Sequence, residues 1–204
     1  MPDDELFHED NIKSKYWSNK WKVYGMGQIG ALDGVILENW HKVDGIPPNA
    51  RKICTGVDFG FSISKFAAVD VYRLDGKYYL KQVVYSTHLT NPQAAEKMKE
   101  NGYNGTVCYC DYAEPKSIKE LKDNGIRAVE CDSKTDIKDF AIQKLNSKPF
   151  YVDKDSKDLI EELSEWVWDT KTGKPQKSNK DHLVDALCYA IGSEGKYSGN
   201  YTYY

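Results

Sequence analysis

The sequence predicts an α/β domain built on a mixed sheet, with three antiparallel strands followed by parallel strands and with helices on both faces. A hairpin signal early in the chain and a regular alternation of helical and extended segments after it carry this prediction. Size agrees with it, because 204 residues, of which 40% are hydrophobic, suffice for one well-packed domain but not for two.

The antiparallel part of the sheet is expected to begin close to residue 51. Ile53–Val57 is a short apolar run rich in β-branched residues that ends at Asp58. Phe66–Leu74 and Tyr78–Tyr85 are two further strands, and the Asp75-Gly76 dipeptide between them is typical of a type I′ hairpin turn. We therefore expect three consecutive strands that lie as antiparallel neighbours.

The remainder of the chain alternates helices and strands. Helices are expected at Pro92–Asn101, Glu114–Asn124, Thr135–Leu145, Lys157–Trp168 and Asp181–Ile191, and strands at Val107–Cys110, Ile126–Cys131 and Phe150–Val152. The polar segment Asp169–Lys180 is expected to be a loop. A helical crossover should place Val107–Cys110 parallel to the first strand and beside it.

The two ends of the chain differ from the middle. Residues 1–50 are rich in aromatic residues and glycine without a clear period, and Pro47-Pro48-Asn49 closes them like a linker. We expect residues 51–192 to form the domain. Residues 193–204 are rich in Gly, Ser and Tyr and are expected to form a flexible tail.

Composition argues against several classes of protein. No apolar run approaches the ~18 residues of a membrane span, and the acidic start lacks the apolar core of a secretory signal. The five cysteines are expected to be reduced core thiols of a cytosolic protein, and Cys108-x-Cys110 lacks the second Cys/His pair of a zinc site. A net charge of −3 argues against a protein that binds nucleic acid by itself through phosphate contacts. It does not argue against an enzyme whose DNA is bound by another domain.

Two aspartates follow strands that should be neighbours. Asp58 comes directly after the first strand and Asp111 directly after the fourth. Their carboxylates would face each other, and a divalent cation would remove the repulsion between them. Each has a structural alternative: Asp58 as a turn residue before Gly60, and Asp111 as a helix cap ahead of Pro115.

The last predicted helix adds three polar residues near one side. Asp181, His182 and Asp185 have i, i+3 and i, i+4 spacings. Asp181 could equally be a helix cap and His182 a surface histidine, but Asp185 lies one turn inside the helix between apolar residues and has no such role. Three aspartates form an all-oxygen site that suits Mg²⁺ or Mn²⁺, and two such ions can activate water for phosphodiester hydrolysis.

Three motifs resemble the nuclease domain of phage and prophage terminase large subunits. They are Gly-Val-Asp-Phe-Gly at 56–60, Cys-Asp-Tyr-Ala-Glu-Pro-Lys-Ser-Ile at 110–118 and Asp-His-Leu-Val-Asp-Ala-Leu-Cys-Tyr-Ala at 181–190. The resemblance covers roughly Lys52–Ile191. Residues 15–40 resemble the segment that leaves the ATPase domain of that family, so residues 1–50 are expected to be the remnant of that exit. No G-x-x-x-x-G-K-[ST] motif occurs in the chain.

The resemblance implies an RNase H-like fold and a Mg²⁺- or Mn²⁺-dependent DNA endonuclease, with two metal ions, that cuts concatemeric double-stranded DNA during packaging. Matched motif by motif, it makes Asp58, Asp111 and Asp185 catalytic metal ligands. His182 and Asp181 become neighbours that orient a water or a ligand, with His182 counted as catalytic and Asp181 as a further candidate metal ligand. Glu114 is an outer candidate whose alternative is an acid at a helix start.

The resemblance also implies partners for the full-length protein. These are the terminase small subunit, the portal protein and the ATPase domain of the same polypeptide, in the cytoplasm of the host cell and with no membrane. Four lysines are candidates for contact with DNA, although a solvated charged surface is the alternative for each: Lys134, Lys171, Lys174 and Lys177.

Three other hypotheses remain open from the sequence. A resolvase or transposase core would share the fold and the metal ions but not the Asp-His-x-x-Asp motif. An actin-like nucleotide-binding half-domain would leave Asp185 unexplained. A non-catalytic docking module of the packaging motor, with vestigial carboxylates, would not cut DNA, and plasmid nicking with Mn²⁺ separates it from the nucleases.

Overall fold

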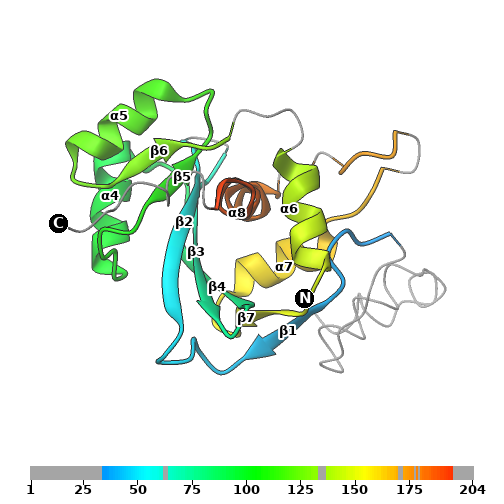
Figure 1. The fold of residues 1–204 in the computed structure, drawn as a ribbon. Helices are drawn as coiled ribbons and strands as arrows, with labels where there is room; N and C mark the ends of the chain where they lie inside the picture. The colour runs from blue at the N-terminus through cyan, green and yellow to red at the C-terminus, as the bar shows by residue number, and fades with distance from the viewer. Residues whose placement is uncertain are drawn as a thin grey trace, which may run out of the picture.

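A single mixed sheet organises the computed structural model, which describes residues 34–61, 64–132, 137–169, 172–176, 178 and 180–194. Within these residues the strand order is β1-β7-β4-β3-β2-β5-β6 (Figure 1). The strands are β1 (Trp40–Val43), β2 (Arg51–Asp58), β3 (Phe66–Leu74), β4 (Lys77–Ser86), β5 (Cys108–Cys110), β6 (Ala128–Glu130) and β7 (Phe150–Asp153). The helices are α4 (Asn91–Glu100), α5 (Pro115–Asp123), α6 (Ile137–Asn146), α7 (Lys157–Glu165) and α8 (His182–Ser193).

Strands β2, β3 and β4 form the predicted antiparallel meander. The turn between β3 and β4 contains Asp75 at φ 49° and Gly76 at φ 75°. Two successive residues with positive φ define a type I′ turn, whose twist matches that of the flanking strands. The hairpin prediction is therefore confirmed.

The parallel part of the sheet lies on both sides of this meander. β5 pairs with β2 in parallel, with Val57 opposite Cys110, and β6 pairs with β5. On the other side β7 runs parallel to β4, and β1 runs parallel to β7. The predicted adjacency of the first and fourth strands is confirmed, as is the mixed α/β sheet.

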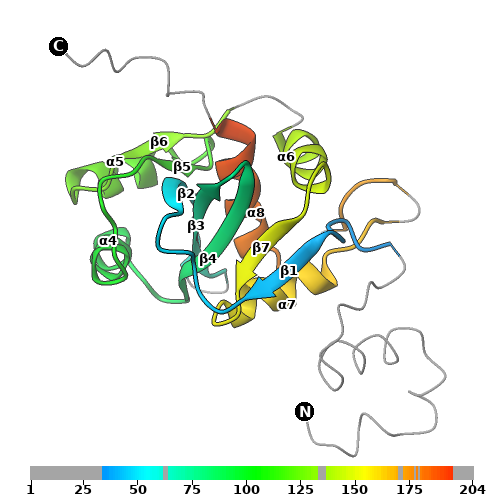
Figure 2. The same cartoon turned by 60° about the horizontal axis from the view of Figure 1, so that its bottom comes forward.

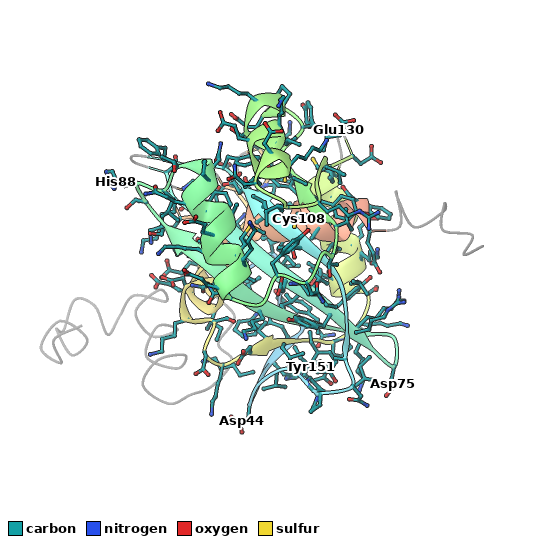
Figure 3. The ribbon with its side chains drawn as sticks, turned by 90° about the vertical axis from the view of Figure 1, so that its left-hand side faces the viewer. Asp44, Asp75, His88, Cys108, Glu130 and Tyr151 are labelled. Carbon is teal, nitrogen blue, oxygen red and sulfur yellow. The ribbon has the colours of Figure 1, made fainter. Side chains whose placement is uncertain are left out.

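Helices cover the two faces of the sheet unequally. α8, α6 and α7 lie on one face, and α4 and α5 lie on the other, near β5 and β6 (Figures 1 and 2). Figure 3 looks onto the α4 and α5 face and shows Tyr151 on the lower part of the sheet, below these two helices. Each face has its own apolar cluster, and α8 supplies most of its length to the larger one.

The sheet extends further towards the N-terminus than the sequence predicted. β1 lies inside the segment expected to be a linker, and Ile36, Leu37 and Trp40 belong to the larger core cluster. A boundary at residue 51 thus cuts through the folded unit, because β1 becomes a strand only by pairing with β7. Residues 1–33 and the tail from 195 lie outside the described residues.

Helix α7 also differs from the prediction, because it ends at Glu165 and not at Trp168. Val167 and Trp168 leave the helix to form isolated bridges with Val35 and Pro175. The helices of the described residues are all too short or too polar to traverse a bilayer.

Candidate functional site

The ends of β2 and β5 bring two of the candidate carboxylates side by side. Asp58 is the last residue of β2, and Asp111 follows the last residue of β5. Because Val57 and Cys110 are register partners in parallel strands, the next residue of each strand leaves the same edge of the sheet. This is the juxtaposition that the sequence predicted.

Helix α8 reaches this edge because β2 carries a glycine where the helix crosses it. A Cβ atom at Gly56 would lie 1.8 Å from the carbonyl oxygen of Ala186. Any larger residue would push α8 away from the sheet, so Gly56 sets the distance of closest approach. This close packing delivers His182 and Asp185, from the first turn of α8, to the strand ends.

Asp58 and His182 form the first of two ion pairs at the site. Nδ1 of His182 lies 2.9 Å from Oδ2 of Asp58, and both side chains are largely buried. Burial raises the pKa of Asp58, and the charge of Asp111 adds to this, while the hydrogen bond from His182 opposes it. The same hydrogen bond raises the pKa of His182 against the effect of burial.

Asp185 and Lys138 form the second pair. Nζ of Lys138 lies 2.5 Å from Oδ1 of Asp185. The buried Oδ1 of Asp185 thus has the ammonium group of Lys138 as its partner. Burial raises the pKa of Asp185 to about 6 against the opposing charge of Lys138, and the charges of Asp181 and Asp58 contribute to the rise.

The other acidic candidates are turned towards backbone groups or a neighbouring helix start. Oδ1 of Asp111 accepts a hydrogen bond from the backbone N–H of Ala113, at 3.0 Å. Asp181 precedes α8 without capping it, and its Oδ2 accepts from the backbone N–H of Ser178, at 3.3 Å. Glu114 stands at the N-terminus of α5 and accepts from the hydroxyl of Ser117, which favours its role as an acid at a helix start.

Two residues of the site were missed in the sequence. Lys138 lay inside a predicted helix with nothing to mark it as a partner of Asp185. Glu162 of α7 is 3% exposed, and its Oε2 accepts from the backbone N–H groups of Leu183 and Val184, at 2.8 and 3.0 Å. Its Oε1 accepts from the hydroxyl of Tyr85, at 2.5 Å. The sequence does hold one sign of a buried role for Glu162, because this acid lies among the apolar residues on the buried side of α7.

Glu162 therefore caps α8 from a different helix. The first backbone N–H groups of a helix have no partner within it and usually need one from a side chain. The residue before α8, Asp181, provides no such bond to the helix. A buried carboxylate from α7 provides it, and this fixes the first turn of α8, where His182 lies.

The donor set matches a hard divalent cation, although the side chains do not form a closed cage. Among the described residues, no three His, Cys, Asp or Glu side chains converge closely enough to hold one ion. Lys138 stands against Asp185, and Asp111 is turned to its own loop. The three carboxylates, among them the buried Oδ1 of Asp185, nevertheless supply the oxygen ligands that Mg²⁺ and Mn²⁺ prefer.

The predicted DNA-contacting lysines fall mostly outside the part of the chain that the structure describes. Lys174 is described and is exposed, in the loop between α7 and α8. Lys134, Lys171 and Lys177 lie among the residues that are not described. The role of all four in binding DNA remains a prediction.

Comparison with solved structures shows the same fold in three phage proteins. The nuclease domain of the large terminase g2p from bacteriophage SPP1, a structure with bound Mn, is 22% identical with a TM-score of 0.63, covering 76% of this chain and 96% of that one. The P22 large terminase nuclease domain is 18% identical with a TM-score of 0.60, covering 76% and 86%.

The third structure is the large terminase of a thermophilic bacteriophage in complex with ATP-gamma-S. It is 22% identical with a TM-score of 0.66, and the similarity covers 78% of this chain but 45% of that one. This chain thus spans less than half the length of that thermophilic phage protein. No curated protein sequence matches this chain.

Structural similarity at 18–22% identity shows a shared fold but not a shared family. A protein-family model provides the family assignment. The model described as the terminase RNase H-like domain matches residues 58–193. The match begins at Asp58 and ends with α8, so it contains all the candidate carboxylates. The chain belongs to the family of terminase RNase H-like domains.

Proposed function

We propose that this domain is a divalent-metal-dependent endonuclease that cuts concatemeric double-stranded DNA for a viral packaging motor. The observation that carries the proposal is the convergence of Asp58, Asp111 and the first turn of α8 at one edge of the sheet. Buried carboxylates of like charge disfavour folding unless cations join them. The Mn in the SPP1 nuclease domain supports the same choice of cation.

Asp58, Asp111 and Asp185 are the residues proposed to hold the metal ions, with Asp181 as a further candidate. Bound there, two Mg²⁺ or Mn²⁺ ions would lower the pKa of a water and stabilise the leaving oxygen of the phosphodiester. His182 orients Asp58 through its Nδ1 contact and leaves Nε2 to hold or move a proton. Glu162 keeps the backbone of that turn in place.

The family assignment supports a proposal for the substrate and the partners. The basic stretch of sequence with Lys171, Lys174 and Lys177, together with Lys134, is proposed to contact phosphates. A net charge of −3 makes this contact weak, so an ATPase domain of the same polypeptide is proposed to hold the DNA. The terminase small subunit and the portal protein are the proposed partners of the full-length protein, in the cytoplasm of the host cell.

Plasmid nicking tests this function directly. The chain should convert supercoiled DNA to nicked and linear forms with Mn²⁺ and with Mg²⁺, without ATP and with little sequence preference. Ca²⁺ should bind without supporting cleavage, because its larger and looser coordination shell misplaces the attacking water. Cleavage in excess EDTA would refute the metal mechanism, and no cleavage with any cation would favour a docking module.

A further inference from the structure

Among the described residues of α6, Lys138 is the one whose positively charged side chain contacts an aspartate of the candidate site. Its Nζ lies 2.5 Å from Oδ1 of Asp185. Its charge also acts on Asp58, whose pKa it lowers against burial, and the charge of Asp181 acts in turn on Lys138. Lys138 therefore contacts Asp185 within a cluster of negative charge, where a divalent cation is also expected.

This contact is unlike an ordinary surface ion pair. The side chains of Lys138 and Asp185 are 38% and 19% exposed. Those of Lys119 and Asp123, a pair at the similar distance of 2.6 Å, are 73% and 58% exposed. Exposed pairs contribute little because water screens them, and screening falls with burial. The pair in the site is thus the stronger of the two.

The fold holds the beginning of α6 against α8. A Cβ atom at Gly192 would lie 2.3 Å from Cγ1 of Ile137, the residue before Lys138. This close approach anchors the backbone from which the lysine side chain extends. The side chain itself is long and partly exposed, so it can leave Asp185 while the helix stays in place.

We propose that Lys138 is a built-in counter-ion that competes with a divalent cation for Asp185, so that the two metal ions of the proposed nuclease bind in sequence. Asp58 and Asp111 hold the first ion without disturbing Lys138. Asp185 can ligate the second ion well only after Lys138 has moved away, because an ammonium group and a divalent cation on the same carboxylate would repel each other at close range. The inference rests on the proposed metal-dependent function, and the position of Lys138 at Asp185 is consistent with the open arrangement of the acidic side chains among the described residues.

The test is a Mn²⁺ titration of the DNA-free protein by calorimetry, with wild type, Lys138→Met and the control Lys119→Met. Wild type and the control should show one stronger and one weaker binding event. In Lys138→Met the weaker event should tighten about five- to tenfold, because the cation no longer displaces an ammonium group. Without metal, Lys138→Met should melt below wild type, since Asp185 then has no counter-ion.

Two further variants keep the test decisive. Lys138→Arg retains the charge and should keep the weak second event, which separates charge from packing. Lys138→Gln replaces the methionine variant if that variant does not fold. Unchanged or weaker second-site affinity in the neutral variants would overturn the proposal, because weaker binding would show that Lys138 positions Asp185 for the metal.

The outcomes also separate this inference from the proposed nuclease function. Mn²⁺ binding that tightens in Lys138→Met, in a protein that never cuts DNA, would support the competition and refute the nuclease. Binding by Lys138→Met alone would support the competition in its strongest form. Absence of Mn²⁺ binding in both proteins would overturn the competition and the metal site together.

Discussion

The two ends of helix α8 carry acidic residues in opposite electrostatic situations. At the C-terminal end, Glu194 contacts Arg73, Lys144 and the hydroxyl of Tyr78. Burial acts to raise the pKa of Glu194, but these partners outweigh it and the pKa lies below its ordinary value. At the N-terminal end, burial prevails and raises the pKa of Asp185 to about 6.

The difference teaches how to distinguish a structural carboxylate from one in a functional site. Around Glu194, one acid is surrounded by two cations and a hydroxyl, so its charge is fully compensated. Around Asp185, the charges of Asp181 and Asp58 add to the effect of burial, and Lys138 is the cation that contacts Asp185. An excess of buried negative charge is unfavourable for the fold alone and is consistent with a binding site for cations.

The largest expected effect is on cleavage, and it should be confined to the N-terminal end. Asp58→Ala, Asp111→Ala and Asp185→Ala should each lower the cleavage rate about a thousandfold or more, since the lost metal contact supplies several kcal/mol in the transition state. Glu194→Ala should leave the rate within about twofold. Single-turnover cleavage with Mn²⁺ measures the rates of all four variants. A wild-type rate for Asp185→Ala would show that Asp185 is not a metal ligand of the nuclease site.

The next effect tests how α8 is held at its N-terminal end. Glu162→Ala should lower the free energy of unfolding by about 2–4 kcal/mol, because two buried backbone N–H groups lose a charged acceptor. This corresponds to about 5–10 °C in Tm for a domain of this size. Glu162→Gln keeps an accepting oxygen and should lose less than half as much in thermal melts. Equal losses of stability in the two variants would show that the hydrogen bonds from Glu162 to α8 do not account for its contribution.

A smaller effect is expected at the C-terminal end and depends on pH. The pKa of Glu194 is depressed in the folded state, so its contribution is present above the ordinary value of 4.5 and is lost as pH falls through the folded pKa. Glu194→Gln should cost about 1 kcal/mol at pH 7 by urea unfolding, and this difference should shrink below pH 4.5. A cost that does not vary with pH would indicate packing and not charge.

The smallest effect is expected in the basic loop that precedes α8. Reversing the charge of Lys174 and Lys177 should weaken DNA binding and reduce the slope of log affinity against log salt by about 0.9 for each lost phosphate contact. Lys154→Glu is the matched control, because Lys154 pairs with Asp44 and Asp44 lies at the lower end of the sheet in Figure 3. An unchanged slope would make the loop a solvated surface.

Features of the fold that depend on local sequence were predictable. Asp75-Gly76 specified the hairpin because both residues adopt positive φ readily. The crossover between β2 and β5 specified their parallel adjacency and hence the juxtaposition of Asp58 and Asp111. The spacing of the aspartates alone did not identify the reaction, and the nuclease prediction came from the family resemblance.

Features that depend on distant contacts were not predictable. β1 is four residues long and has no period of its own, so only its pairing with β7 defines it. The roles of Lys138 and Glu162 arise where α6 and α7 approach α8, which no local pattern encodes. The same holds for the end of α7, where Val167 and Trp168 leave the helix for partners far away in the chain.

The Mn²⁺-induced change in Tm of Asp185→Asn tests the central claim most directly, because it needs no DNA. With a Kd of about 1 mM, roughly 10 mM Mn²⁺ should raise the wild-type Tm by about 3–6 °C. Asp185→Asn should lose most of this shift. It should also melt higher than wild type without metal, because burial disfavours the charge of Asp185 even beside Lys138, whose partly exposed side chain can turn to solvent. Asp75→Asn, in a turn at φ 49° that asparagine tolerates, should behave as wild type. If Asp185→Asn melts lower without metal and keeps the full shift, Asp185 is structural and the metal site lies elsewhere.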